Sequence, residues 1–258
     1  MNIGIIIQAR TSSTRLPKKV LLKLPYNSKY TVLDQVIKRC KLSKFSNRVI
    51  VATTTDREDD KIINIAKKNK VYFFRGSKED VLSRYYYAAK ENKLDAIVRV
   101  TSDCPFVDCK IVDDLIELFL KNNCDYASNT LKRTYPHGLD CEVFSIDALE
   151  KSFKECKNIK FREHVTLYIY NNPKKFKIKL LEAPKKLNRP EIRITLDTEE
   201  DYALSCAVYD YLYKKGQYFD CGSVINLFNA KPWLFLINKK IAQKKIFKNI
   251  KDELEEAV

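Results

Sequence analysis

Glycine is scarce in this chain, with only five among 258 residues. Neither the Gly-x-Gly-x-x-Gly fingerprint nor a Gly-rich Walker loop occurs, so any phosphate site must depend on cationic side chains more than on backbone amides. The eight cysteines include no Cys-x-x-Cys pair, which argues against a zinc ribbon or a thioredoxin-type motif. The chain has just two histidines, and no set of residues has the spacing of zinc ligands.

Long apolar runs are also missing, and none could span a bilayer. The first residues lack the features of a signal peptide, so we expect a cytoplasmic protein without a membrane partner. The formal net charge of +15 suits an anionic partner. We interpret the scattered lysines as a soluble surface. The arginines at the ends of predicted strands are better candidates for function.

Apolar runs alternate with helical periodicity through the first half of the chain. Strands are predicted at 3–7, 48–52, 71–74, 96–100 and 125–127, and helices at 31–44, 59–68, 78–92 and 110–121. Strands joined by helices of about a dozen residues indicate βαβ units, and hence an α/β fold with a mostly parallel central sheet.

The second half is less regular. We predict one domain over residues 1–258 with a small α+β insertion at about 129–190. The insertion has predicted strands at 141–144 and 176–181 and helices at 146–155 and 161–171. It is followed by a returning strand at 191–196, a helix at 198–214 and an amphipathic helix over the final twenty residues.

A cationic loop follows the first predicted strand. Arg10, Arg15 and Lys19 lie in it among small hydroxyl residues such as Ser13. Guanidinium groups pair with phosphate oxygens two at a time, and open α/β sheets bind ligands at the carboxyl ends of their strands. The loop therefore favours a polyphosphate site, although a solvated basic loop has the same composition.

Two aspartates also follow predicted strands. Asp103 comes after the strand at 96–100, and Asp197 ends the strand at 191–196. If both strands belong to one parallel sheet, the two carboxylates meet at one edge. Mg²⁺ takes few protein carboxylates and completes its shell with water and phosphate oxygens. The alternatives are an Asx-turn for Asp103 and a helix N-cap for Asp197.

Two further polar groups are candidates for binding an acceptor. Arg75, Asp80 and Arg84 surround the start of a predicted helix, where Ser77 is a plausible N-cap and an Asp80–Arg84 pair would be a structural alternative. Both histidines lie beside carboxylates in the irregular segment, which favours a functional role, with a structural role as the alternative. This second group comprises Tyr135, His137, Asp140, Glu142 and His164.

Several of these motifs occur in the order found in one family. The chain resembles nucleotidyltransferases of the CMP-sugar synthetase type, in particular the cytidylyltransferase-like spore-coat polysaccharide biosynthesis proteins. The resemblance extends to about residue 212. It rests on Gln8-Ala9-Arg10…Ser13-Thr14-Arg15-Leu16-Pro17-Lys18-Lys19, Ala52-Thr53-Thr54, Asp80-Val81-Leu82…Arg84-Tyr85, Arg99…Thr101-Ser102-Asp103-Cys104-Pro105, Tyr135-Pro136-x-Gly138-x-Asp140-x-Glu142-Val143, Arg162-Glu163-His164-Val165-Thr166 and Leu196-Asp197-Thr198-x-x-Asp201.

The resemblance implies a three-layer GT-A-like fold, Mg²⁺ dependence, a homodimer, and transfer of CMP from CTP with release of pyrophosphate. Arg10, Arg15 and Lys19 would bind the triphosphate, Asp103 and Asp197 the metal, and Gln8, Ala9, Thr53 and Thr54 would lie near the base and ribose. It does not identify the acceptor, because the sugar-reading residues of the sialic acid and KDO enzymes are missing. We expect an acidic sugar or a small phosphate or phosphonate metabolite.

Two other functions are weighed against this one. A GT-A glycosyltransferase would share the fold, but it usually needs an Asp-x-Asp triplet, and none occurs here. A nucleic-acid-binding protein would explain the positive charge. However, the informative cations are separated along the sequence and form no single stripe, so we expect no nucleic acid partner.

Overall fold

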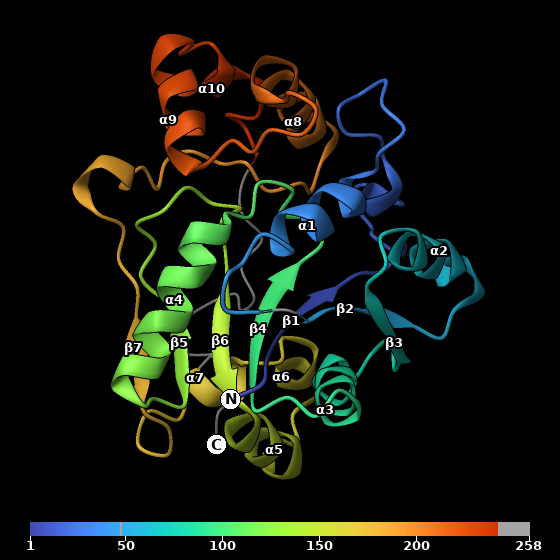
Figure 1. Cartoon of the computed structure of the whole chain (residues 1–258), viewed down its shortest axis with the longest axis vertical. Helices are drawn as coiled ribbons and strands as arrows, with labels where there is room; N and C mark the ends of the chain where they lie inside the picture. Colours follow the sequence, from blue (N-terminus) through green and yellow to red (C-terminus); the bar gives the residue numbers. More distant parts are fainter. Residues whose placement is uncertain (47, 242–258) are drawn as a thin grey trace.

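A seven-stranded sheet lies at the centre of the structure, a computed structural model that describes residues 1–46 and 48–241 (Figure 1). The strand order is β3-β2-β1-β4-β6-β5-β7, and among the described strands only β6 runs antiparallel to the rest. The strands are β1 (Ile3–Gln8), β2 (Arg48–Thr54), β3 (Tyr72–Gly76), β4 (Ala96–Thr101), β5 (Tyr126–Ser128), β6 (Glu142–Ser145) and β7 (Ile178–Leu180). The predicted α/β class with a mostly parallel sheet is confirmed.

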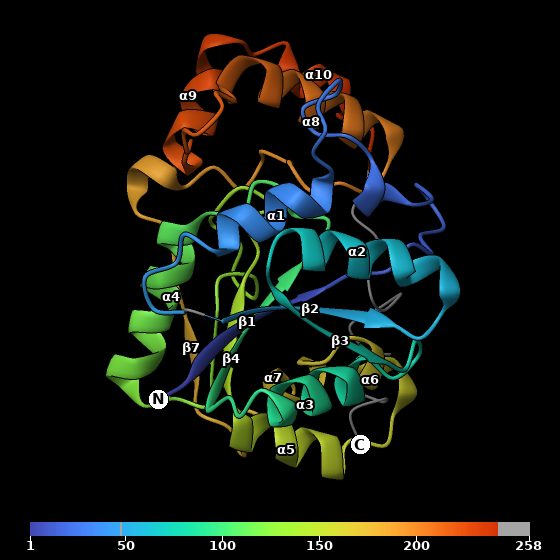
Figure 2. The same ribbon diagram turned by 45° about the vertical axis from the view of Figure 1, so that its right-hand side comes forward.

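Helices cover both faces of the sheet (Figures 1 and 2). One face packs against α1 (Val32–Cys40), α2 (Asp60–Lys68) and α4 (Cys109–Asn122), with α8 (Glu199–Leu212), α9 (Cys221–Ala230) and α10 (Leu234–Ile237) beyond them. The other face packs against α3 (Val81–Glu91), α5 (Ile146–Glu155), α6 (Ile159–Glu163) and α7 (Leu167–Tyr170). Short 3-10 helices lie at Lys19–Leu21, Arg57–Asp59 and Lys185–Leu187.

The unbroken apolar run of β1 follows from this layering. Ile5 and Ile7 belong to the core beneath α1, whereas Ile6 belongs to the core beneath α3. All three side chains are fully buried. A central parallel strand covered on both faces needs apolar residues at every position, which explains the absence of polar alternation.

The structure corrects several predicted elements. The strand expected at 191–196 is wrong, because this segment joins no strand of the sheet and forms one isolated bridge, between Arg193 and His137. The helix expected at 161–171 is divided into α6 and α7 around Val165, whose φ is +62°. Asp80, not Ser77, caps α3 by accepting a hydrogen bond from the amide of Ser83.

The less regular segment at 129–190 contributes to the central sheet, since β6 and β7 both pair within it. Helices α9 and α10 were not predicted. Most of the predicted C-terminal helix, residues 242–258, lies outside the described residues. No helix in the described part of the chain combines the length and apolarity needed to cross a membrane.

Gly138, in the irregular segment, lies close against the backbone of Ile194 and Thr195. Its φ is +112°, and an added Cβ would lie 2.6 Å from the amide nitrogen of Thr195 and 2.7 Å from the carbonyl carbon of Ile194. Gly138→Ala should therefore lower the free energy of unfolding by roughly 2–5 kcal/mol, through backbone strain and overpacking.

Urea denaturation measures this loss. Gly222→Ala is the matched control, because a Cβ there would lie no closer than 3.5 Å to its neighbours. If the two variants were equally stable, the close approach at Gly138 would not constrain the fold.

Candidate active site

The loop after β1 is shaped by a buried carboxylate. Asp59 accepts hydrogen bonds from the backbone amide and the hydroxyl of Thr11, at 2.8 and 2.7 Å, and from the hydroxyl of Thr54 at 2.5 Å. Asp59 is 1% exposed. Burial alone would raise its pKa, but these hydroxyl and amide donors outweigh that effect and lower it. Asp59 and Thr54 thus fix the start of the cationic loop.

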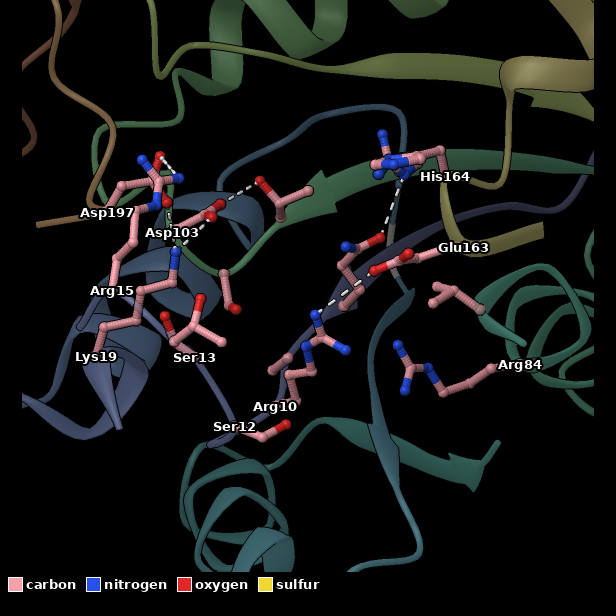
Figure 3. Close-up of a pocket in the computed structure, with 17 residues that line it drawn as sticks. Arg10, Ser12, Ser13, Arg15, Lys19, Arg84, Asp103, Glu163, His164 and Asp197 are labelled. Carbon is pink, nitrogen blue, oxygen red and sulfur yellow. Dashed lines mark hydrogen bonds and ion pairs between the residues drawn. The ribbon is translucent and has the colours of Figure 1, made fainter. Parts of the chain in front are cut away.

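Lys19 joins the two predicted aspartates. Its Nζ lies 2.8 Å from Oδ2 of Asp103 and 2.9 Å from Oδ1 of Asp197, and it also donates to the carbonyl of Leu196 at 2.8 Å. The structure therefore brings together three residues that are far apart in the sequence (Figure 3). The amide of Leu196 donates to the carbonyl of Asp103 at 2.8 Å, so backbone pairing holds the two aspartates at one edge although 191–196 is no strand.

Asp197 is the more heavily paired of the two carboxylates. Its Oδ2 lies 3.0 Å from Nη2 of Arg15 and 3.2 Å from Nη2 of Arg193. Arg193 is held in turn by Asp201, through Nε at 3.0 Å and Nη2 at 2.8 Å. Asp201 also accepts from the amide of Asp197 at 3.0 Å. Thr198 and Asp201 form a capping box at the start of α8, so Thr198 caps this helix and the alternative of Asp197 as its N-cap is wrong.

The charged groups at this edge change one another's pKa values. Burial works against ionisation of both Asp103 and Lys19, but their mutual attraction outweighs it. With the added hydrogen bond from Thr101, the pKa of Asp103 falls to about 2. Asp103 and Asp197 together raise the pKa of Lys19. Both groups are therefore charged at neutral pH.

This pairing predicts a pH dependence of stability. The pKa of Asp103 in the folded protein is lower than in the unfolded chain, so its contribution is complete above about pH 4 and is lost as the pH falls toward 2. The full contribution is roughly 2 kcal/mol. Urea unfolding at a series of pH values should show that the free energy of unfolding falls less steeply with acidification for Asp103→Asn than for the wild type. Equal slopes in the two proteins would contradict the pairing.

A cavity of about 320 Å³ opens over this edge (Figure 3). Its charged lining is mostly cationic: Arg10, Arg15, Lys19, Arg84 and Arg99, against Asp103, Glu163 and Asp197. Gln8, Ala9, Ser12, Ser13 and Thr14 complete the side formed by the loop after β1. Such a lining suits a ligand that bears several negative charges.

Arg84 is the most deeply buried cation of this cavity. The residue is 2% exposed, and its Nη1 donates to the carbonyl of Ser77 at 3.1 Å. Its Nε has no hydrogen-bond partner among the described residues. Burial, together with the nearby charge of Arg10, lowers its pKa. The alternative of an Asp80–Arg84 pair does not form, since Asp80 pairs with Arg162, and Arg84 points into the cavity (Figure 3).

A second cavity of about 580 Å³ adjoins the first and shares Arg15, Arg99, Asp103, His164 and Asp197 with it. Four of the predicted acceptor residues line it, namely His137, Asp140, Glu142 and His164. Burial lowers the pKa of His137, although the nearby carboxylate of Asp140 acts in the opposite direction. The lowered pKa keeps the imidazole neutral at pH 7. The second cavity therefore extends the site away from the cationic loop.

Five predicted site residues line neither cavity: Thr53, Thr54, Arg75, Asp80 and Tyr135. Thr53 and Thr54 are fully buried, and Tyr135 is 3% exposed. Arg75 pairs with Asp60 at 2.8 Å, and Asp80 pairs with Arg162 at 2.7 Å. These residues support the framework of the site, and we leave them out of the binding surface.

Sequence reasoning missed four charged residues as site members, of which Lys160 lines the second cavity. Arg99 on β4 lines both cavities, pairs with Glu142 and donates to Oε1 of Gln8 at 3.3 Å. A cation inside an apolar strand was the available signal. Glu163 at the end of α6 lies 3.8 Å from Arg10. Arg193 could be recognised only from its contacts, because the segment before Asp197 looked like an ordinary strand.

Comparisons with known proteins identify the family of this chain. The cytidylyltransferase family model matches residues 4–249. The chain is 36% identical to the spore coat polysaccharide biosynthesis protein SpsF of Bacillus subtilis, over 90% of this chain and 95% of that protein. It is 25% identical to the 3-deoxy-manno-octulosonate cytidylyltransferase of Rickettsia akari, over 83% and 98% of the two chains.

Among solved structures, a cytidylyltransferase from Leptospira borgpetersenii superposes with a TM-score of 0.86 at 38% identity. The match covers 94% of this chain and all of that one. The family model matches most of the chain, and a relative that is 36% identical covers 90% of it, so family membership is shown. This chain belongs to the cytidylyltransferase family.

Proposed function

We propose that this protein transfers CMP from CTP to an acidic acceptor, either an acidic sugar or a small phosphate or phosphonate metabolite, and releases pyrophosphate. The observation that supports this most strongly is the meeting of Lys19 with Asp103 and Asp197 in a cavity lined by five cations. A triphosphate is the ligand whose charge best matches such a lining.

In the proposed reaction an acceptor oxygen attacks the α-phosphorus of CTP. A new P–O bond forms, and the bond between the α-phosphorus and the oxygen bridging to the β-phosphorus breaks. The electron pair of that bond leaves with pyrophosphate. Arg10, Arg15 and Lys19 would hold the β- and γ-phosphates and stabilise the charge that develops on the leaving group. Gln8, Ala9 and Ser13 would contact the remainder of the nucleotide.

Mg²⁺ is part of the proposal. The residues fit it, because a single cation, the ammonium of Lys19, already lies within 2.9 Å of an oxygen from each aspartate. Nowhere in the described residues, this site included, are three or more His, Cys, Asp or Glu side chains grouped to hold a metal ion, so the proposed site relies on two protein ligands. Two carboxylates suffice for Mg²⁺, which keeps water and phosphate ligands. When bound by Asp103 and Asp197, it would neutralise phosphate charge and help align the reacting groups.

The second cavity is the proposed acceptor site. Arg15, Arg99 and Lys160 line it and would supply positive charge for an acid group. His137, Asp140 and His164 line it as well, and would contact the remainder of the acceptor. A carboxylate, phosphate or phosphonate oxygen needs no strong general base, since it is already ionised at neutral pH. A sugar hydroxyl would have to release its proton on attack, and a Mg²⁺ held by Asp103 and Asp197 would lower the pKa of that hydroxyl.

A pyrophosphate-release screen tests the proposal. The purified protein is incubated with each of the four nucleoside triphosphates, Mg²⁺ and a panel of acidic sugars, phosphates and phosphonates. We expect release with CTP and one acceptor class only. Release with no combination, together with salt-dependent binding of RNA, would favour the nucleic-acid-binding alternative. The homodimer stays a prediction, which light scattering after size-exclusion chromatography would check.

A further inference from the structure

A third cavity, of about 510 Å³, lies away from the proposed active site. It is formed by α1, the C-terminal end of α8 and the segment that follows α8. Figures 1 and 2 show α1 and α8 on the same side of the central sheet. Its walls are largely aromatic: Tyr30, Tyr209, Tyr213, Tyr218 and Phe219. A cavity of this size accommodates a small organic molecule.

The charged residues of this cavity all have the same sign. Lys38, Arg39, Lys41 and Lys215 line it, and none of the described lining residues is acidic. In the described part of the chain, none of these four cations lies within 4.0 Å of a carboxylate oxygen; Asp34, one turn before Lys38, attracts Lys38 from further away and pairs with Lys68 at 3.4 Å. Lys41 donates to the carbonyl of Asn69 at 3.2 Å, and Nζ of Lys38 lies 3.0 Å from the centre of the Tyr30 ring. A net excess of positive charge at an aromatic cavity attracts an anion.

Arg39 gives the cavity a buried cation. The residue is 6% exposed, and its guanidinium carbon lies 4.6 Å from the ring centres of both Tyr218 and Phe219. Its Nε donates to the carbonyl of Val107 at 2.7 Å and its Nη2 to that of Phe219 at 2.8 Å. Two carbonyls satisfy part of its hydrogen-bonding capacity but leave its positive charge unpaired.

We propose that this cavity is a binding site for a small aromatic anion, whose ring packs among the tyrosines while its acid group lies between Arg39, Lys38 and Lys215. Aromatic faces and cations placed side by side recognise a molecule that has both a planar apolar body and a negative charge. A neutral aromatic compound would leave the cations unpaired, and a purely inorganic anion would leave the aromatic walls unused.

The same side chains touch the segment that follows Asp103. Tyr209 donates its hydroxyl to the carbonyl of Pro105 at 2.7 Å, and Arg39 donates to Val107 as described. A ligand in this cavity would therefore contact residues that hold the turn after one of the two proposed metal ligands.

Two matched probes test the binding site. 8-Anilinonaphthalene-1-sulfonate is an aromatic anion, and N-phenyl-1-naphthylamine is its uncharged counterpart. Fluorescence titration of the full chain should show clearly tighter binding of the sulfonate. The double variant Lys38→Gln/Lys215→Gln should weaken sulfonate binding by about fivefold or more, because each lost charge-assisted contact contributes to affinity. Binding of the neutral probe should change little.

The control is Lys121→Gln/Lys154→Gln, which removes two exposed lysines that line none of the three cavities. It should bind the sulfonate as the wild type does. Lys38 is half-buried and Lys215 is exposed, so the double variant should keep the fold, and an unchanged circular dichroism spectrum and unchanged binding of the neutral probe would verify this. Equal sulfonate affinity in the double variant and the wild type would overturn the proposal, as would equal affinity of the wild type for the two probes.

Discussion

Replacing Lys19 with glutamine should slow CMP transfer by about 10²–10³-fold, which corresponds to roughly 2.7–4 kcal/mol of lost transition-state stabilisation. The ammonium is the only group that touches Asp103, Asp197 and the carbonyl of Leu196 together in the described structure. Glutamine keeps much of the length but removes the charge that would meet the departing pyrophosphate. Initial rates of pyrophosphate release at saturating CTP measure the effect.

Lys18→Gln is the matched control for this variant. Lys18 is exposed, lines neither active-site cavity, and directly precedes Lys19. Its replacement removes the same charge from the same loop and should change the rate less than twofold. If both variants were equally slow, general electrostatic attraction by the loop would explain the loss better than the position of Lys19.

A second readout of the Lys19 variant does not depend on activity. Without nucleotide, the wild-type ammonium lies between the two carboxylates and competes with a divalent cation for them. Lys19→Gln should therefore bind Mn²⁺, a paramagnetic substitute for Mg²⁺, more tightly than the wild type, as measured by electron paramagnetic resonance. Unchanged or weaker Mn²⁺ binding would contradict the assignment of Asp103 and Asp197 as metal ligands.

Replacing Asp201 with alanine should destabilise the fold by about 3–5 kcal/mol, the usual result of removing one partner from a buried ion pair. The side chain of Asp201 is fully buried, and that of Arg193 is 11% exposed. Without Asp201, Arg193 would lose two hydrogen bonds, and Asn238 would lose the acceptor that its amide reaches at 2.8 Å. Urea denaturation followed by circular dichroism measures the change.

Glu199→Gln provides the comparison. Glu199 lies in the same first turn of α8, is exposed, and has no ion pair among the described residues. Its replacement should change stability by less than about 0.5 kcal/mol. A small effect of Asp201→Ala, similar to that of Glu199→Gln, would show that the Arg193 pair contributes little. Asp201→Asn, which keeps the shape of the side chain, should fall between the two.

Much of the site could be predicted from local sequence. The cationic loop after β1 and the aspartate after β4 follow buried strands directly, and chain continuity places them at the carboxyl edge of a parallel sheet. Thr53 and Thr54 are the last two residues of β2, at the same edge of the sheet, yet their side chains are buried. Periodicity indicates that a strand ends, but it does not say whether the residue at its end faces the cavity or the core.

The sequence pattern also did not reveal where a predicted helix is interrupted. The pattern at 161–171 is compatible with one helix, but Val165 adopts a positive φ and places Glu163 and His164 at the cavities. A β-branched residue disfavours that conformation, so nothing local predicts it. Only the surrounding packing selects it, because Val165 is fully buried in the core beneath α3.

By itself, the sequence determined the α/β class, the nearly parallel sheet and the family, because these depend on periodicity and on motifs that keep their order along the chain. Tertiary structure alone decided which charges meet. Lys19 and Asp197 are separated by 178 positions, and the segment before Asp197 reaches Asp103 by backbone pairing outside the sheet. The network of Asp201, Arg193 and Asn238 likewise depends on how α8 and the end of α10 pack. A sequence pattern reports only on residues that are close together along the chain, whereas ion pairing depends on distances between side chains in the folded structure.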